Sequence, residues 1–138
     1  MPGSFFDSNV LLYIASGDVA KAERAEELVN GGGTISIQVL NEIANVARRK
    51  MVLSWPETRT FLLLIRGLLP VEPMTIEGHE TGLRLAERHG LSVFDAVIVA
   101  SALQADCHTL WSEDMQHGLT IEKRLRIVNP FKTVSPTQ

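Results

Sequence analysis

Short apolar stretches alternate with longer stretches of helical periodicity along the chain, and this alternation limits its fold more than any other feature. The predicted strands are Ser4–Phe6, Thr34–Ser36, Val71–Met74, Cys107–Trp111 and Arg126–Val128. The predicted helices are Ser8–Ala15, Val19–Val29, Ile37–Lys50, a segment from Trp55 to Pro70, Thr75–His89 and Ser92–Ala105. Strand–helix alternation of this kind predicts an α/β fold of three layers, α/β/α, around a central parallel β-sheet.

The size and composition of the chain favour one cytoplasmic domain. With 138 residues, 45% of them hydrophobic, the chain is long enough for one core, so we expect a single domain over residues 1–138. Its longest apolar runs fall far short of the roughly 20 residues of a membrane helix, so no membrane partner is expected. The first residues, MPGSFF, lack the basic start of a signal peptide. Cys107 is the only cysteine, which excludes an intrachain disulfide and fits a reducing cytoplasm.

The overall charge excludes one mode of nucleic-acid binding. The net charge is -3 and the sequence pI is about 5.8. A protein that holds nucleic acid through bulk electrostatics is strongly basic, and this chain is not. Any contact with nucleic acid must therefore be local, or be assisted by metal cations.

Two aspartates follow predicted strands. Asp7 comes directly after Ser4–Phe6, and Asp114 comes shortly after the strand CHTLW. Taken alone, Asp7 is predicted to be the N-cap of the next helix, and Asp114 is predicted to be a turn residue. In a parallel α/β sheet, however, ligands bind at the carboxyl ends of the strands, where both aspartates are expected.

A third aspartate opens the most apolar helix of the chain. The residues three, four and seven places after Asp95 are Ile98, Val99 and Ala102, so helical periodicity predicts that its carboxylate lies on a buried face. Ser92 and Asp95 also have the spacing of a capping box. A cap explains an exposed aspartate better than a buried one, which favours a functional role.

If Asp7, Asp95 and Asp114 meet at one edge of the sheet, their mutual repulsion must be relieved. Carboxylates that lie close together share protons or bind a cation. Because the candidate ligands are oxygens, the cation would be Mg²⁺ or Mn²⁺, which activates water in phosphodiester cleavage. Glu42 lies on the polar flank of its helix, and periodicity alone places it at the surface.

At this point the sequence resembles the PIN-domain nucleases of the VapC toxin type. Asp7-Ser8-Asn9 matches the early signature of that family, and Glu42 in VLNE matches its acidic residue near mid-chain. Asp95 in GLSVFDA and Asp114 in SEDM match the two later acidic positions. Four motifs in order, over nearly the whole chain, carry the resemblance.

The resemblance implies a compact α/β/α fold and a metal-dependent endoribonuclease that hydrolyses RNA. It implies that Asp7, Asp95 and Asp114 hold Mg²⁺ or Mn²⁺ directly or through water. Glu42 would bind the metal through water or orient the nucleophile. The resemblance also implies a homodimer and, for a toxin, a small antitoxin protein that blocks the site.

The same resemblance implies supporting roles for Ser112 and Asn9. It implies no role for Glu113 or His117. Ser112 and Asn9 would position carboxylates or water through hydrogen bonds. Glu113 is an additional carboxylate that reads as solvent-exposed. His117 follows Asp114 closely and is kept as a reserve ligand.

Two alternatives stay open beside the ribonuclease. One is a catalytically inactive PIN-like module that binds RNA or protein. The other is a haloacid-dehalogenase-like phosphatase with Asp7 as its nucleophile. Such enzymes carry a second aspartate two residues after the first, but this chain has Asn9 there and is short for that fold.

Overall fold

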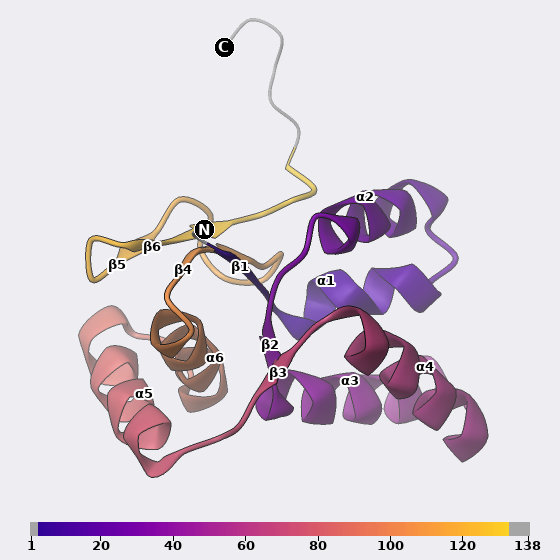
Figure 1. The fold of residues 1–138 in the computed structure, drawn as a ribbon, viewed down its shortest axis with the longest axis horizontal. Helices are drawn as coiled ribbons and strands as arrows, with labels where there is room; N and C mark the ends of the chain where they lie inside the picture. The colour runs from indigo at the N-terminus through magenta and orange to yellow at the C-terminus, as the bar shows by residue number, and fades with distance from the viewer. Residues whose placement is uncertain (1–2, 133–138) are drawn as a thin grey trace, which may run out of the picture.

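The computed structural model describes residues 3–132 and contains every predicted helix and strand, with small shifts at their ends (Figure 1). The ends of the predicted domain, residues 1–2 and 133–138, lie outside the described residues. The strands are β1 (Gly3–Phe6), β2 (Ile35–Ser36), β3 (Val71–Glu72), β4 (Cys107–Trp111), β5 (Thr120–Ile121) and β6 (Leu125–Val128). The helices are α1 (Ser8–Leu12), α2 (Val19–Asn30), α3 (Ile37–Arg49), α4 (Trp55–Leu68), α5 (Ile76–His89) and α6 (Val93–Gln104), and Tyr13–Ala15 extends α1 as a 3-10 turn, η1.

The strands form a mostly parallel sheet in the order β3-β2-β1-β4-β6-β5. β1 pairs in parallel with β4, β4 with β6, and β2 with β3. A parallel bridge between Phe5 and Thr34 joins β1 to the β2–β3 pair, and the Phe6 N–H donates to the Thr34 carbonyl at 3.1 Å. Only the edge strand β5 is antiparallel to its neighbour. The predicted parallel α/β sheet is therefore confirmed.

Helices cover both faces of this sheet, as the three-layer prediction requires. In Figure 1, α5 and α6 lie on one side of β2 and β3, and α1 and α2 lie on the other. α6 packs against both α5 and β4, and every residue from Ala96 to Leu103 is buried. An apolar sequence with no polar face is what a helix enclosed in this way requires. Phe5 and Phe6 are fully buried beneath the helices.

The antiparallel edge strand is the element that the sequence did not predict. β5 has two residues and is joined to β6 by a tight turn in which Glu122 and Lys123 have φ values of 54° and 59°.

No helix in the described part of the chain has the length and apolar composition needed to cross a membrane.

The pairing of β1 with β4 places two chain segments beside each other at the carboxyl end of the sheet. Phe6 and Trp111, the last residues of the two strands, are partners in register. The Asp7 N–H donates to the Trp111 carbonyl at 2.9 Å, and the Ser112 N–H donates to the Val128 carbonyl at 3.0 Å. The segment that begins at Asp7 and the segment that begins at Ser112 therefore start next to each other.

Candidate functional site

Asp7 is the buried centre of the site. It caps α1, with its Oδ1 accepting a hydrogen bond from the Ser8 N–H at 2.7 Å, and its exposed fraction is 3%. Burial raises the pKa of Asp7 to about 6. Hydrogen bonds from Ser112 and the Ser8 backbone oppose this rise in the pKa, and the negative charges of Glu42 and Asp95 add to it. The predicted cap is present, and this carboxyl also lies within the field of other acids.

Ser112 and Asn9 hold the second oxygen of Asp7. The Ser112 hydroxyl donates to Asp7 Oδ2 at 2.8 Å, and Asn9 Nδ2 donates to the same oxygen at 3.2 Å. Ser112 is fully buried and also accepts a hydrogen bond from the Met115 N–H at 3.2 Å. The two residues therefore lie where a positioning role requires them.

Glu42 lies closer to the interior than its helical periodicity predicted. It is half-buried, because α3 packs against α1, and the Ser8 hydroxyl donates to its Oε1 at 2.9 Å. Gln38, one turn earlier on α3, donates to Oε2 at 3.1 Å. Ser8 thus joins Glu42 to the segment of Asp7. The sequence analysis missed Ser8 and Gln38, although the four-residue spacing of Gln38 and Glu42 is a recognisable signal for a helical pair.

The prediction that Asp95 lies on a buried face was wrong in degree. The residue is half-buried, because it lies in the first turn of α6, before the enclosed part of the helix begins. Ser92 caps this helix by accepting a hydrogen bond from the Asp95 N–H at 3.1 Å. Burial raises the pKa of Asp95, the Ser92 side chain lowers it, and the charge of Asp114 raises it further.

Asp114 lies on an exposed loop after β4, and its charge reaches the same site. It contributes to a hollow of about 310 Å³ whose lining also includes Ser8, Asn9 and Lys50. The carboxyls thus affect one another's pKa values: Glu42 and Asp95 raise the pKa of Asp7, and Asp114 raises the pKa of Asp95.

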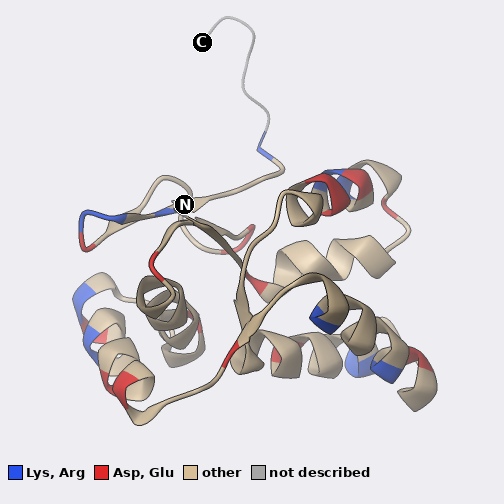
Figure 2. Ribbon diagram, viewed as in Figure 1, with Lys and Arg blue, Asp and Glu red and all other residues tan. Residues whose placement is uncertain are grey.

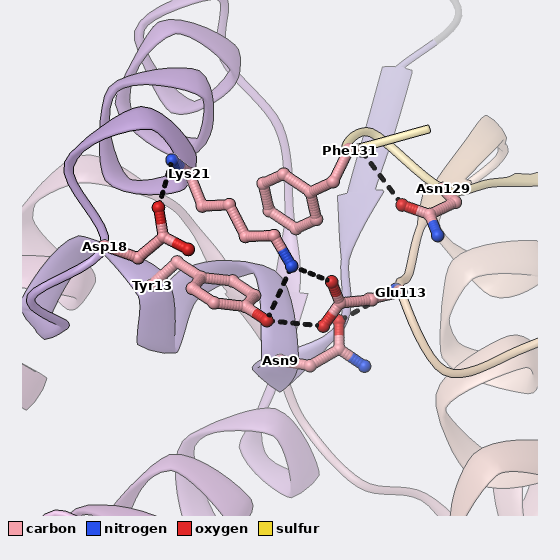
Figure 3. Close-up of polar contacts among 7 residues, drawn as sticks. All are labelled: Asn9, Tyr13, Asp18, Lys21, Glu113, Asn129 and Phe131. Carbon is pink, nitrogen blue, oxygen red and sulfur yellow. Dashed lines mark hydrogen bonds and ion pairs between the residues drawn. The ribbon is translucent and has the colours of Figure 1, made fainter. Parts of the chain in front are cut away.

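Glu113 is half-buried and bonded, contrary to the expectation of an exposed carboxylate. Its Oε1 accepts from the Tyr13 hydroxyl at 2.7 Å, and its Oε2 pairs with Lys21 Nζ at 2.7 Å (Figure 3). The Glu113 N–H also donates to Asn9 Oδ1 at 3.0 Å. Partial burial acts to raise the pKa of Glu113, but the bonds from Lys21 and Tyr13 outweigh it and lower this pKa. We call Tyr13, Lys21 and Glu113 the loop clamp.

The loop clamp fixes the segment that bears the last acidic position. Lys21 Nζ lies 4.6 Å from the centre of the Tyr13 ring, and the Phe131 ring packs edge-on against Tyr13 at 4.9 Å (Figure 3). The clamp joins η1, α2 and the loop after β4. No sequence motif indicated these contacts, because they link residues about a hundred positions apart.

His117, the reserve ligand, has a different role. Its Nδ1 accepts a hydrogen bond from the Asn129 N–H at 3.0 Å, which ties the loop after β4 to the chain beyond β6. The side chain is used in a local structural contact.

The donor set fits a divalent cation in chemistry, although the side chains are not yet gathered around one point. Asp7, Glu42, Asp95 and Asp114 offer only oxygen ligands, and none of the four forms an ion pair with Lys or Arg within residues 3–132. Over the same residues, no three Asp, Glu, His or Cys side chains are placed so that they could already hold one ion. Burial is the main cause of the raised pKa values of Asp7 and Asp95, and the neighbouring carboxyls add to both rises.

The fold and the site define an α/β protein with interacting carboxyls at the carboxyl edge of a parallel sheet. The family model described as "PIN domain" matches residues 4–118, so the chain belongs to the PIN domain family, whose members are nucleases. No curated protein sequence matches the chain.

Solved structures of similar fold include several toxin–antitoxin proteins. A toxin–antitoxin complex from Klebsiella pneumoniae superposes with a TM-score of 0.70 at 20% identity, covering 94% of this chain and 99% of the other. Mycobacterium tuberculosis VapC20, a toxin that cleaves the sarcin-ricin loop, gives 0.67 at 19% identity, covering 80% and 89%. A DNA-bound VapBC from Salmonella typhimurium gives 0.64 at 16% identity, covering 92% and 97%. At these identities the likeness establishes the fold.

Proposed function

We propose that the chain is a metal-dependent endoribonuclease that hydrolyses RNA phosphodiester bonds, and that it is the cytoplasmic toxin of a toxin–antitoxin pair. The observation that carries the proposal is the buried position of Asp7, whose pKa is raised by burial and, to a smaller extent, by the charges of Glu42 and Asp95. This supports one site for acidic residues from distant parts of the chain, in a member of a nuclease family.

In the proposed mechanism, Asp7, Asp95 and Asp114 would hold Mg²⁺ or Mn²⁺ directly or through water. Glu42 would bind the metal through water or orient the water that attacks phosphorus in line with the leaving oxygen. Ser112 and Asn9 fix the orientation of the Asp7 carboxylate. When bound, the cation supplies a Lewis acid that activates water and offsets charge on the phosphate.

Two features near the acids support RNA as the substrate. Lys50 lines the same hollow as Asp114 and supplies a local cation for a phosphate. Figure 2 shows further basic residues along α4 and at the end of α3, and all of them are arginines. Local cations of this kind suit a chain whose net charge is -3.

The outer face of α4 supports a protein partner. Phe61, Ile65 and Leu69 face the core, while Leu63, Leu64 and Leu68 are 62%, 51% and 48% exposed. Three exposed leucines on one helix form an apolar surface that a monomer rarely leaves uncovered. We assign this surface to a homodimer contact and propose a small antitoxin as a further partner, as in the toxin–antitoxin complexes of similar fold.

The alternative function is an inactive PIN-like module that binds RNA or protein. The observation that favours it is that, over residues 3–132, the acids are not already gathered into a three-ligand set. The two functions differ in metal binding and in turnover, so one set of experiments separates them.

The first test is an RNA cleavage assay on the wild-type protein and Asp95→Asn. We expect cleavage with Mg²⁺ or Mn²⁺ and none with chelator. Asp95→Asn should lower the rate by more than the roughly 10- to 100-fold that follows loss of an outer-shell partner. Asp106→Asn is the matched control, because Asp106 is an exposed aspartate at the opposite end of β4. Wild-type cleavage rates in Asp95→Asn would overturn the proposed site.

A thermal-shift assay separates the enzyme from the inactive module. Mn²⁺ that binds only the native state raises the melting temperature of the wild-type protein. Asp7→Ala should abolish the rise. A wild-type protein with neither a shift nor RNA cleavage would support the inactive module.

Growth arrest on expression, relieved by Asp95→Asn, would support the toxin assignment.

A further inference from the structure

Phe94 is an exposed aromatic residue beside the acids. Its side chain is 66% exposed, whereas its helix, α6, is buried from Ala96 to Leu103. It directly precedes Asp95, so its position relative to the acidic site is fixed by the first turn of α6. One exposed aromatic residue is ordinary on a protein surface. The surroundings of Phe94 are what make it informative.

Phe94 forms one wall of a hollow of about 310 Å³, and α3 forms the other wall. The α3 residues are Gln38, Asn41, Glu42 and Asn45, three of which carry side-chain amides. Their spacing of three and four residues places them on one face of the helix. No Lys or Arg side chain lines the hollow, so it does not have the chemistry of a phosphate site.

Two of the three amides in this hollow are available to a ligand, while Gln38 donates to Glu42. Asn41 and Asn45 are exposed, and within the described chain no hydrogen bond engages their side-chain amides. Each amide offers both donors and an acceptor. An aromatic face beside such groups suits an unstacked nucleobase, which stacks on the ring and pairs its polar edge with amides.

The hollow adjoins the acidic site and does not include Lys50. Glu42 lines the hollow and also raises the pKa of Asp7, so it belongs to both places. Lys50 lies in the separate hollow with Asp114. A strand of RNA at the acids would therefore have two distinct hollows within reach, one with a cation and one with an aromatic ring and amides.

We propose that Phe94, Asn41 and Asn45 form a subsite for one unstacked nucleobase next to the scissile phosphodiester, and that this subsite sets the base preference of cleavage. The inference rests on the proposed ribonuclease function for its biological meaning. The recognition itself is a binding event that is measured without turnover.

The binding test uses short single-stranded RNA oligonucleotides in the presence of chelator, so that no cleavage occurs. Fluorescence anisotropy would compare wild type, Phe94→Ala and Phe94→Trp. Loss of one stacked base should weaken binding by roughly 5- to 100-fold in Phe94→Ala, while Phe94→Trp should stay within about threefold of wild type. Leu83→Ala is the matched control, because it removes an exposed apolar side chain from α5, away from the hollow and from the leucines of α4.

An abasic scan gives the decisive version of this experiment. Replacing one nucleotide at a time by an abasic residue should reduce wild-type affinity most at one position. The same replacement should have little further effect in Phe94→Ala, because base and ring interact with each other. Equal sensitivity of both proteins at every position would overturn the subsite. Unchanged RNA affinity in Phe94→Ala together with an altered oligomeric state in light scattering would also overturn it, by assigning Phe94 to a protein contact.

The cleavage test keeps the subsite and the ribonuclease apart. Sequencing the cut sites of a randomised RNA should show a base preference in wild type that Asn45→Ala and Phe94→Ala both relax. Wild-type cleavage with the same preference in both variants would overturn the subsite and leave the ribonuclease standing. Without any wild-type cleavage the ribonuclease fails, and the abasic scan still decides whether the hollow binds a base.

Discussion

At the residue scale, the protonated and ionised forms of Asp7 are each favoured by different features of its surroundings. Burial and the nearby charges of Glu42 and Asp95 favour the protonated form and raise its pKa to about 6. A metal ligand must be ionised, so binding of a cation as proposed would release the proton that burial retains. Ser112, Asn9 and the Ser8 N–H favour the ionised form because each donates a hydrogen bond to it. The surroundings of Asp7 are thus polar enough to hold a carboxylate, but within residues 3–132 no Lys or Arg pairs with it.

The raised pKa of Asp7 predicts how stability depends on pH in the absence of metal. Between the unfolded value of 3.8 and the folded value of about 6, the native state binds more protons than the unfolded state. The contribution of Asp7 to the free energy of unfolding is therefore fully present below about pH 4 and is lost as the pH rises to about 6. The loss amounts to about 3 kcal/mol.

Denaturant unfolding with chelator at several pH values checks this prediction. Subtracting the curve of Asp7→Asn from that of wild type isolates the contribution of Asp7, and the difference should vary between pH 4 and 6. Asp18→Asn is the control, because Asp18 is an exposed cap of α2 and asparagine caps equally well. A difference that is constant across this pH range would contradict a raised pKa.

At the element scale, the loop clamp connects α2 and η1 to the loop of Asp114. Glu113→Gln keeps the size of the side chain but removes the charge that pairs with Lys21. Because the pair is partly exposed, we expect a cost of about 1 kcal/mol or less in unfolding free energy. The effect on the loop should be larger, with Mn²⁺ affinity falling several-fold, towards about 10-fold.

Mn²⁺ titration by calorimetry or electron paramagnetic resonance measures this effect. Glu27→Gln is the matched control, because Glu27 pairs with Arg24 on the exposed face of α2. An equal loss of Mn²⁺ affinity in the two variants would show that Glu113 does not position the loop.

Two helical glycines give a second element-scale prediction. A Cβ at Gly82 on α5 would lie 3.0 Å from Val97 Cγ2 and 3.3 Å from Val97 Cα on α6, whereas a Cβ at Gly67 on α4 would meet nothing within 4 Å. Both substitutions to alanine gain up to about 1 kcal/mol of helix propensity. At Gly82 we expect overpacking of about 1–3 kcal/mol to outweigh that gain.

The melting temperatures of the two alanine variants test the packing of α5 on α6. Gly67→Ala should melt at or above the wild-type temperature, and Gly82→Ala should melt below it. If Gly82→Ala were as stable as Gly67→Ala, the two helices would have room to separate.

At the scale of the whole molecule, the sequence predicted the elements more reliably than the contacts between them. Apolar periodicity and caps such as Asp7 and Ser92 are local signals, and they located the helices correctly. β5 escaped prediction because its turn places Glu122 and Lys123 at positive φ without the Gly or Asn that signals such a turn.

The site was predictable where local signals coincide with the topology. Asp7 and Asp114 follow strands, and a parallel sheet brings the ends of its strands together. Periodicity placed Glu42 at the surface because the packing of α1 on α3 is a tertiary contact. Periodicity predicted a more deeply buried Asp95, because it depends only on the apolar residues that follow Asp95 along the helix. The first turn of α6 is more exposed than the rest of the helix. Glu113 was missed because its partners are distant in sequence.

The exposed leucines of α4 give the last prediction, which concerns assembly. Leu64 is 51% exposed beside Leu63 and Leu68, and burying these side chains against a second copy would remove apolar surface from water. We therefore expect a dimer for wild type in size-exclusion chromatography with light scattering. Leu64→Glu should shift it to monomer, because the charge would be desolvated in the contact. Leu83→Glu, at a 42% exposed position on α5, should leave the dimer intact. A monomeric wild type, or loss of the dimer in both variants, would contradict α4 as the contact surface.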